Sequence, residues 1–542
     1  MSDQISMSDD LPENPSRRRL LQAGAAASLL GAVPAVSATN PARAAGSLDA
    51  KLKQHIQNVV VIYLENRSFA NLFAQFPGCL EVDSAPQRDR QGQVLGELPK
   101  IWGGMVPESQ TLGGKTYEIK EASITGLPNG AFKLTDAAGQ PLPPGVITRD
   151  LWHRFYQNQM QINGGKNDQF VAWSNTGAMV MGYYGDSANT LGLWQVARQY
   201  TLCDRFFMSA FGGSFLNHQF LVAARAPYYS DAPTGPAKNS IAVTEDGATG
   251  VRLAQKSSSP ASALDGPPVF VNDGNLTPDG YAVNTMAPAF QPSYIRPAAG
   301  GNPALADPQS PSVLPPQTHL TIADLLSHKA VSWSWYGGAW QSALDNVGGG
   351  PRPNFQYHHQ PLNYFQQFAP GTTARARHLL DGGVGDSPIS NKFLRDVVAG
   401  KLPAVSFYKP QGSLSMHAGY TDVESGDAHV VNVLEHLKHS PQWHQMLVVI
   451  TFDENGGWWD PVAPPKGDRW GPGSRVPAII VSPFAKQGQV DHTFYDTTSI
   501  LRFITRRFDL PLLPGIVERN AAFASNHALP PGDLTAALSF PV

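Results

Sequence analysis

The clearest pattern in the chain is a pair of uninterrupted apolar runs, each followed at once by acidic and amide residues. The first run covers residues 58–64 and is followed by Glu65–Asn66. The second covers residues 446–452 and is followed by Asp453–Glu454. Continuous β-branched and aromatic runs of this length predict strands buried on both faces, as in parallel sheets. Because ligands bind at the carboxyl edge of such sheets, the two strand ends predict one shared site.

Weaker patterns along the rest of the chain predict an α/β fold. Strand patterns alternate with helical spacing, and this order favours a mostly parallel central sheet with helices on both faces. The predicted helices cover residues 151–162, 191–200, 321–328, 427–438 and 497–507, and the further predicted strands cover residues 331–336, 404–408 and 477–482.

Two long segments interrupt this alternation. Residues 70–150 are rich in turn-forming residues and are interpreted as a hairpin insertion. Residues 226–318 are dense in Pro, Gly, Ser and Asn, with only short apolar stretches. A structureless loop of this length is improbable in a compact domain, so we expect an ordered insertion or a cap over a site.

The composition is typical of a globular protein that does not bind nucleic acid. The 542 residues are 42% hydrophobic and 15% charged, the formal net charge is −3, and no block of Lys or Arg occurs. Such a charge pattern argues against a nucleic-acid partner. Nothing in the composition indicates an oligomeric state.

The N-terminus has the pattern of an export signal. Residues 16–22 read Ser-Arg-Arg-Arg-Leu-Leu-Gln, which matches the twin-arginine pattern, and a weakly apolar run follows from Ala23 to Val36. A membrane-anchoring helix is the alternative, but Pro34 and the many small residues make the run short and polar. We expect a signal segment at residues 1–45, export by the twin-arginine machinery to the periplasm or the medium, and one domain over residues 46–542.

The two cysteines, Cys79 and Cys203, leave two alternatives open. An exported protein can form one disulfide between them, because its destination is oxidising. The other reading is two separate thiols, of which buried ones behave as small apolar groups.

The acidic pairs provide the ligand types of a metal site. Glu65, Asn66, Asp453 and Glu454 offer four oxygen donors, three of them anionic, which suit one divalent ion such as Ca²⁺, Mg²⁺ or Mn²⁺, with iron as a further option. Each residue could instead cap the helix or turn that follows it. The repetition of the arrangement at two strand ends favours the metal.

A serine follows two glycines at the start of a helical run. Ser214 comes directly after Gly212–Gly213, where a helix N-terminus would stabilise an alkoxide and bind an anion. The competing reading is an ordinary capping serine. Because the Gly-x-Ser-x-Gly elbow of α/β-hydrolases is absent here, acyl transfer is disfavoured.

Four histidines near glycines or loops are candidates for phosphate binding or for protonating a leaving group. They are His153, His358, His359 and His417. A single histidine is more often a surface residue or a satisfied core residue. The sequence lacks His-Glu-x-x-His, so a zinc protease of that type is not indicated.

Two motifs together resemble a known family. The sequences Leu-Glu-Asn-Arg-Ser-Phe at 64–69 and Phe-Asp-Glu-Asn-Gly-Gly at 452–457 are similar to those of the bacterial phospholipase C/acid phosphatase (phosphoesterase) family. That family belongs to the alkaline-phosphatase-like superfamily, and the resemblance runs over residues 55–510. It implies that the two acidic pairs hold the metal, that Ser214 is the nucleophile and that the four histidines surround the phosphate.

Two departures from the family pattern bear on the substrate. The phospholipase branch has Thr-x-Pro-Asn-Arg where this chain has Ser-Phe-Leu-Asn-His at 214–218, and Asp-His-Val where it has Asp-Pro-Val at 460–462. The resemblance therefore favours an exported, metal-dependent acid phosphatase that hydrolyses small phosphomonoesters through a phosphoserine. The alternatives are a phospholipase C or phosphodiesterase with the same site, acting on phospholipid head groups, and a non-catalytic binding protein.

Overall fold

The computed structural model describes residues 41–80, 84–118, 125–247, 249–346 and 354–541. The predicted signal at residues 1–45 lies almost wholly outside these ranges. Residues Asp49–Val542 group into one compact unit. Among the described residues, no helix combines the length and apolarity needed to cross a bilayer.

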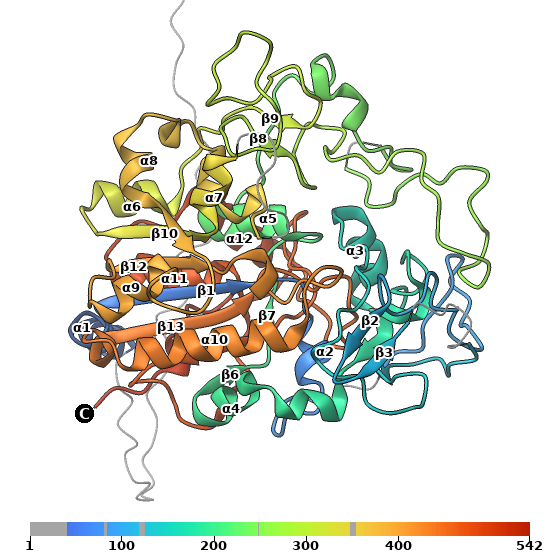
Figure 1. The fold of residues 1–542 in the computed structure, drawn as a ribbon, viewed down its shortest axis with the longest axis horizontal. Coiled ribbons are helices and arrows are strands. Elements are labelled where there is room, and N and C mark those ends of the chain that lie inside the picture. The colour runs from blue at the N-terminus through green and yellow to red at the C-terminus, as the bar shows by residue number, and fades with distance from the viewer. Residues whose placement is uncertain (1–40, 81–83, 119–124, 248, 347–353, 542) are drawn as a thin grey trace, which may run out of the picture. The chain divides into compact units, whose positions relative to one another are not determined.

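The centre of this unit is an eight-stranded sheet (Figure 1). Its order is β11-β10-β12-β1-β13-β14-β6-β15, and within it only β14 runs antiparallel to its neighbours. The mostly parallel α/β architecture is thereby confirmed. The strands are β1 (Asn58–Leu64), β6 (Thr201–Cys203), β10 (Trp333–Gly338), β11 (Leu379–Gly383), β12 (Val405–Lys409), β13 (Met446–Phe452), β14 (Ala478–Val481) and β15 (Gln489–Asp491).

The two strands that the sequence marks most clearly are neighbours in the sheet. β1 and β13 pair in parallel from Asn58 opposite Met446 to Leu64 opposite Phe452, and every residue of both strands is buried. Because they end in register, the residues that follow leave the sheet side by side. The Asp453 amide continues the ladder by donating to the Leu64 carbonyl over 3.0 Å.

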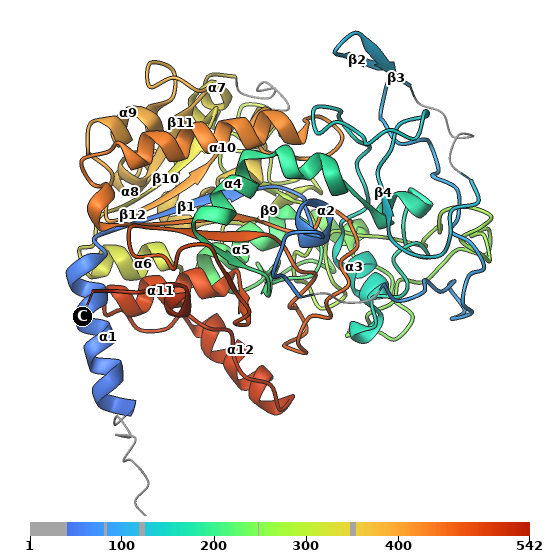
Figure 2. The ribbon, with the colours of Figure 1, turned by 90° about the horizontal axis from the view of Figure 1, so that it is seen from below.

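Helices cover both faces of the sheet (Figure 2). α4, α7, α9 and α10 lie on one face, and α5, α6, α11 and α12 lie on the other. The helices are α1 (Pro41–His55), α2 (Phe69–Phe73), α3 (Phe155–Ile162), α4 (Gly192–Gln199), α5 (Ser214–Ala223), α6 (Ile322–His328), α7 (Trp340–Asp345), α8 (Thr373–His378), α9 (Lys392–Val398), α10 (Val423–Lys438), α11 (Thr498–Arg507) and α12 (Pro514–Ser525).

The two predicted insertions differ in regularity. Within residues 70–150, β2 and β3 form a short antiparallel hairpin. The described part of residues 226–318 consists mainly of turns, with β8 paired to β9. The short strands outside the main sheet are β2 (Gln110–Leu112), β3 (Lys115–Tyr117), β4 (Phe132–Lys133), β5 (Gly182–Tyr183), β7 (Phe206–Phe207), β8 (Ala287–Pro288), β9 (Val313–Leu314) and β16 (Tyr495–Asp496).

The helix predicted over residues 151–162 is shorter than expected. α3 begins only at Phe155, because the preceding Arg154 is extended (φ −106°, ψ 159°) and the Trp152 amide donates to the Asn175 side chain over 2.8 Å. Tertiary hydrogen bonds thus override the local helical spacing. This leaves His153 in an extended segment rather than on a helix.

The cysteines do not form a disulfide in this structure. Cys79 is partly buried, Cys203 is fully buried, and both are free thiols. Burial raises the pKa of the Cys79 thiol to about 12, so this group is protonated at neutral pH. Of the two alternatives that the sequence leaves open, the structure has the separate thiols.

A buried arginine connects α12 to the loop that precedes Ser214. Arg519 forms ion pairs with Asp496 (3.0 Å) and Asp468 (2.9 Å) and donates to the Ser209 carbonyl over 2.6 Å. Its side chain is fully buried.

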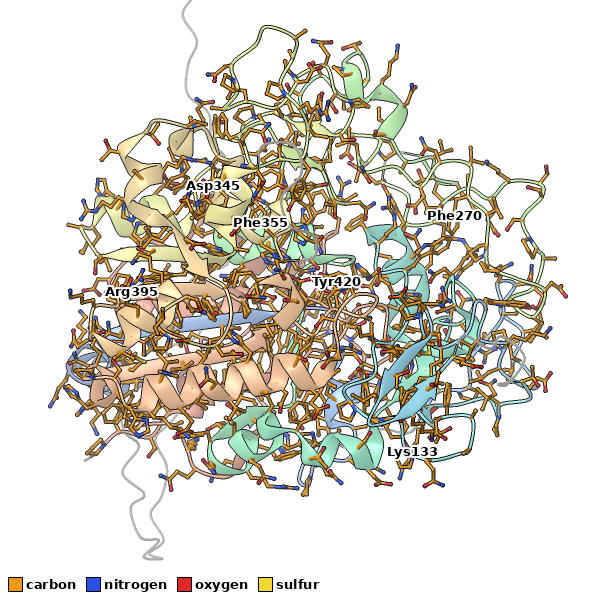
Figure 3. All side chains as sticks on the ribbon, viewed as in Figure 1. Lys133, Phe270, Asp345, Phe355, Arg395 and Tyr420 are labelled. Carbon is orange, nitrogen blue, oxygen red and sulfur yellow. The ribbon has the colours of Figure 1, made fainter. Side chains whose placement is uncertain are left out.

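We predict that Arg519→Met lowers the free energy of unfolding by about 3 to 5 kcal/mol, because it leaves Asp496 buried without its partner. The exposed Arg395, labelled in Figure 3, provides a matched control in which Arg395→Met changes stability by less than about 0.5 kcal/mol. Chemical denaturation monitored by tryptophan fluorescence measures both. Equal stability of the two variants would contradict the structural role of Arg519.

Candidate active site

The two predicted acidic pairs meet at the carboxyl edge of the sheet. Asn66 adopts a left-handed conformation (φ 64°), and its amide donates to Asp453 Oδ1 over 3.1 Å. Gly456 makes this approach possible, because a Cβ at that position would lie 2.2 Å from the Asn66 carbonyl oxygen. Non-glycine residues with positive φ are uncommon and often occur at functional sites.

Ser214 faces these residues from the opposite side. It is the first residue of α5, whose N-cap is Gly213, and it makes no capping hydrogen bond. Instead its Oγ donates to Asn66 Oδ1 over 3.2 Å, and its residue is only 5% exposed. The capping explanation for this serine therefore does not hold.

The carboxylates keep free oxygen atoms. Asp453 Oδ1 accepts from the Glu454 amide (2.7 Å), and Glu454 Oε2 accepts from the Gly456 amide (2.5 Å). One oxygen of each carboxylate is therefore hydrogen-bonded to the backbone of the turn. Asp453 Oδ2 and Glu454 Oε1 are buried and have no hydrogen-bond partner among the described residues. Capping thus explains the hydrogen bonds of one oxygen in each carboxylate, and the other oxygen of each is available to a ligand.

Burial of these acids changes their pKa values. Burial, together with the nearby Glu65 charge, raises the pKa of Asp453 to about 6. Burial and the Asp453 charge raise the pKa of Glu454 well above its usual range. Burial would raise Glu65 as well, but the charges of His359 and Lys409 outweigh it and hold the pKa of Glu65 well below its ordinary value.

Three side chains from other segments contact the Glu65 carboxylate. The Lys409 ammonium, from the last residue of β12, lies 2.7 Å from Glu65 Oε1, and both side chains are fully buried. His359 Nε2 contacts the same oxygen. On the other oxygen, Oε2 accepts from the Tyr420 hydroxyl over 3.2 Å; Tyr420 is labelled in Figure 3.

His153 and His417 form the more accessible side of the site. Their rings lie 5.6 Å apart, and His153 Nε2 is 3.3 Å from Asn66 Nδ2 and 3.9 Å from Glu454 Oε1. The His153 side chain is 19% exposed, and Asp150 beside it is 49% exposed. His153 Nδ1 donates to the Leu151 carbonyl over 2.6 Å, which leaves Nε2 directed to the site.

His358 and His359 lie deeper, on the short turn that precedes the 361–364 segment. Both are buried, and neither nitrogen of His358 has a hydrogen-bond partner among the described residues. Burial lowers the pKa of both imidazoles, and the charge of Glu65 opposes this shift. Phe355, labelled in Figure 3, packs against His359 with ring centres 6.3 Å apart.

The long insertion supports these histidine segments from outside. Arg154, next to His153, pairs with Asp273 of the insertion over 2.7 Å. Tyr294 of the insertion packs against Tyr357, next to His358, with ring centres 5.8 Å apart. Residues 226–318 thereby contact both histidine-bearing segments.

All nine predicted site residues gather around this edge of the sheet, and three further residues join them. Lys409 is the last residue of β12, a strand that the sequence predicts. A single lysine after an apolar run does not by itself indicate a site residue. His218 lies one turn after Ser214 on α5, with Nδ1 3.7 Å from Asp453 Oδ2, and helical spacing could have placed it there. Tyr420 lies three residues after His417 on an irregular segment, where no periodicity helps.

The donor set fits a divalent metal ion. Three buried carboxylates cannot all ionise in a dry interior without a compensating charge, and two of them have free, buried oxygens. The side-chain ligand atoms of Glu65, His358 and His359 lie within 4.8 Å of one another, as do those of Asp150, His153 and His417. Of the predicted metal ligands, Glu65 belongs to the first of these groups, whereas Asp453 and Glu454 belong to neither.

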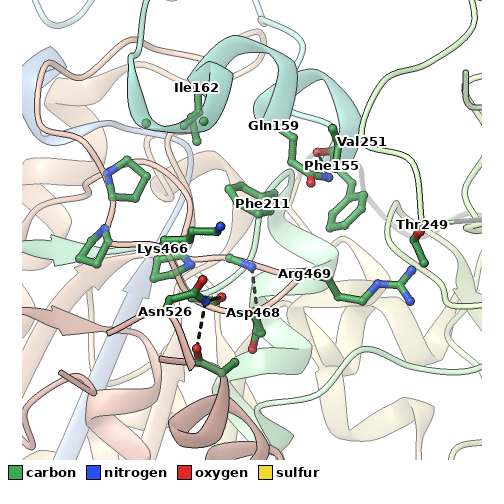
Figure 4. A pocket seen from close by; sticks show the side chains of 18 of the residues that line it. Phe155, Gln159, Ile162, Phe211, Thr249, Val251, Lys466, Asp468, Arg469 and Asn526 are labelled. Carbon is green, nitrogen blue, oxygen red and sulfur yellow. Dashed lines mark hydrogen bonds between the residues drawn. The ribbon is translucent and has the colours of Figure 1, made fainter. Parts of the chain in front are cut away.

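A separate cavity lies behind the segments that carry His153 and Ser214 (Figure 4). Its volume is about 580 Å³, and Phe155, Phe211, Lys466 and Arg469 are among the residues that line it. None of the nine site residues lines this cavity. The predicted site residues therefore lie outside this cavity.

Comparison with known proteins assigns the family. The sequence profile of the phosphoesterase family matches residues 56–511, which is most of the chain. The chain belongs to the phosphoesterase family. This family consists of hydrolases that act on phosphoester bonds. The matched range includes both strand ends, Ser214 and all four candidate histidines.

The relatives of this phosphoesterase include several phospholipases C. It is 24% identical over 564 residues to phospholipase C B of Mycobacterium tuberculosis, covering 97% of this chain and 86% of that protein. It is 32% identical over 255 residues to the non-hemolytic phospholipase C of Pseudomonas aeruginosa, where the match covers 41% of this chain and only 33% of the relative. The chain therefore spans about a third of that second relative's length.

Solved structures are less similar to this phosphoesterase. A protein in the alkaline phosphatase superfamily from Vibrio parahaemolyticus aligns over 44% of this chain and 56% of its own, with 15% identity and a TM-score of 0.24. This likeness is too low to carry an argument about the site, which rests on the residues described above.

We predict that Asp453→Asn weakens divalent metal binding by about 100-fold or more, because it removes one anionic ligand from a buried set. Elemental analysis after dialysis against a trace of Mn²⁺ measures the bound ion. The exposed Asp246 gives the matched control, and Asp246→Asn keeps the wild-type metal content. Retention of a full equivalent by Asp453→Asn would remove Asp453 from the ligand set.

Proposed function

We propose that this protein is an exported, metal-dependent acid phosphatase in which Ser214 attacks the phosphorus of small phosphomonoesters. The observation that carries the proposal is the position of the Ser214 hydroxyl. It lies at the N-terminus of a ten-residue helix and donates to Asn66, whose amide in turn is held by Asp453. A hydroxyl so placed, beside free carboxylate oxygens, has the surroundings of an activated nucleophile.

The residues have distinct roles in this proposal. When bound, a divalent ion would neutralise phosphate oxygens and favour the ionised form of the serine hydroxyl. The Asn66 side chain positions Ser214 Oγ by accepting a hydrogen bond from it over 3.2 Å. The backbone N–H groups in the first turn of α5 would favour the negative charge of a phosphate bound beside Ser214.

The histidines complete the proposed phosphate site. His358 has no hydrogen-bond partner among the described residues, so its ring is free to bind a phosphate oxygen. His153 and His417 lie on the accessible side, where the leaving alcohol departs, and one of them protonates it. Water then releases phosphate from Ser214. Since phosphoryl transfer demands little covalent chemistry, positioning and charge supply most of the rate enhancement.

We predict that Ser214→Ala lowers kcat for p-nitrophenyl phosphate by about a thousandfold or more while the bound metal content stays unchanged, because the variant loses only the nucleophile. Ser257→Ala, at an exposed position of the long insertion, is the matched control and keeps the wild-type rate. Steady-state kinetics and elemental analysis on the same samples test the assignment. A Ser214→Ala rate near that of the control would rule it out.

A phospholipase C or phosphodiesterase activity is the second candidate function. The names of the relatives favour it, since both proteins compared above are phospholipases C. The serine at position 214 and Pro461 in place of the histidine of that branch favour the phosphomonoesterase.

Two substrates that share one leaving group separate these candidates. We predict that kcat/KM is at least about tenfold higher for p-nitrophenyl phosphate than for p-nitrophenylphosphocholine, because a monoester would present more anionic oxygens to a bound divalent ion than a diester does. The release of p-nitrophenol measures both rates. The reverse preference would make the chain a phospholipase C or phosphodiesterase with the same serine and metal ligands.

The proposed location follows from the twin arginines at 17 and 18. We predict that replacing Arg17 and Arg18 together by lysine keeps the protein in the cytoplasm with its N-terminus intact, because the export machinery reads the arginine pair. The control is Arg43→Lys, near the expected cleavage site, which is exported normally. Cell fractionation shows where each variant is located, and intact-mass measurement shows whether its N-terminus is cleaved. Normal export of the double variant would exclude the twin-arginine route.

A further inference from the structure

The cavity of about 580 Å³ shown in Figure 4 has no role in the proposed phosphatase chemistry. Its walls come from α3, from the end of α12, from the segment at 464–472 and from residues 249–251 of the long insertion. Its volume lies within the range of about 300 to 1,000 Å³ that pockets for small molecules occupy. A cavity bordered by four separate segments is therefore large enough to bind a ligand.

Much of the cavity wall is apolar. Phe155 and Phe211 line it, as do Ile162, Val251 and Pro464. The two phenylalanine rings lie edge to face, with ring centres 6.3 Å apart and an angle of 69° between the rings. Such a wall favours a hydrocarbon group, because removal of apolar surface from water is the main favourable contribution to its binding.

Two hydrogen-bond donors in the wall have no partner among the described residues. The Tyr156 side chain is buried, and its hydroxyl forms no hydrogen bond with another described residue. Burial raises the pKa of Tyr156, so the hydroxyl keeps its proton and can donate a hydrogen bond. The exposed Lys466 forms no ion pair with a described residue. Figure 4 shows Lys466 among the side chains around the cavity.

The other charged groups of the wall are already paired. Arg469 donates two hydrogen bonds to Asp279, over 2.6 and 3.0 Å. Asp468 pairs with Arg519 over 2.9 Å. Tyr156 and Lys466 are therefore the side chains that can serve a ligand which accepts hydrogen bonds and carries a negative charge.

We propose that this cavity binds a fatty-acid-like amphiphile, with the hydrocarbon chain against the phenylalanine wall and the carboxylate recognised by Lys466 and the Tyr156 hydroxyl. One ammonium balances the single negative charge of a carboxylate, whose two oxygens both accept hydrogen bonds. The inference goes beyond the phosphatase activity and does not rest on it, since none of the nine predicted site residues lines the cavity.

The experiment measures displacement of a dansyl-labelled undecanoic acid from the full protein by dansyl fluorescence. Three competitors separate the parts of the ligand: decanoate, hexanoate with a shorter chain, and decanol with an uncharged head. We expect decanoate to compete at least about tenfold more strongly than hexanoate, because each further buried methylene group favours binding.

Two exposed wall residues give variants that should keep the fold. Lys466→Met is expected to weaken decanoate binding at least about threefold and to leave decanol binding unchanged, because only the carboxylate pairs with the ammonium. Lys401→Met, at an exposed lysine outside the cavity, is its control. Val251→Asp places a negative charge in the wall and is expected to weaken decanoate binding at least about tenfold. Its control is Val271→Asp, at a similarly exposed position of the same insertion.

A third variant tests the buried hydroxyl. Tyr156→Phe is expected to weaken decanoate and decanol alike by about fivefold, because both ligands carry an oxygen that accepts from this group. Tyr228→Phe, at an exposed tyrosine outside the cavity, is the control and leaves both affinities unchanged.

Each contrary outcome overturns a stated part of the inference. Absence of saturable probe binding, or equal decanoate affinity in Val251→Asp and Val271→Asp, overturns the site itself. An effect of Lys466→Met that is absent, or equal for decanoate and decanol, overturns recognition of the anionic head. These two variants decide even where Tyr156→Phe does not fold. None of the outcomes bears on the phosphatase activity, which hydrolysis of p-nitrophenyl phosphate tests separately.

Discussion

The structure of the site depends on the electrostatic repulsion among three buried carboxylates at one edge of a sheet. Glu65 follows β1, and Asp453 and Glu454 follow β13, and none of the three side chains reaches solvent. Ionised groups in such surroundings must be paired or neutralised. The Lys409 ammonium lies 2.7 Å from Glu65 Oε1, while Asp453 Oδ2 and Glu454 Oε1 stay buried without a hydrogen-bond partner among the described residues.

The surrounding fold holds this repulsive arrangement in place. Parallel pairing of β1 and β13 over seven residues makes their ends coincide, so the acids cannot separate without breaking the centre of the sheet. Asn66 occupies a left-handed conformation that Gly456 accommodates, and it links Asp453 to Ser214. Strain at such a residue persists only where the surrounding packing fixes it, and here the fixed geometry keeps Asn66 within hydrogen-bond distance of Ser214, the proposed nucleophile.

The strands and site residues that the sequence predicts best are those with a strong periodic pattern or a motif. β1 and β13 are continuous apolar runs, and their register brings together the acids that the two motifs contain. The start of α3 could not be predicted in the same way, since residues 151–154 are held extended by the Trp152–Asn175 hydrogen bond, a contact between separate segments. Lys409 and Tyr420 reach Glu65 only through tertiary structure, and no local pattern of residues distinguishes them from ordinary surface or core positions.

The most direct test of the central claim is a crystal structure of the protein soaked with Mn²⁺ and orthovanadate, a mimic of the phosphoryl transition state, recorded at the manganese absorption edge. The account predicts one anomalous peak within coordination distance of Glu65, Asn66, Asp453 and Glu454, with vanadium bonded to Ser214 Oγ. An ion bound elsewhere in the protein, or vanadate held without contact to Ser214, would contradict it.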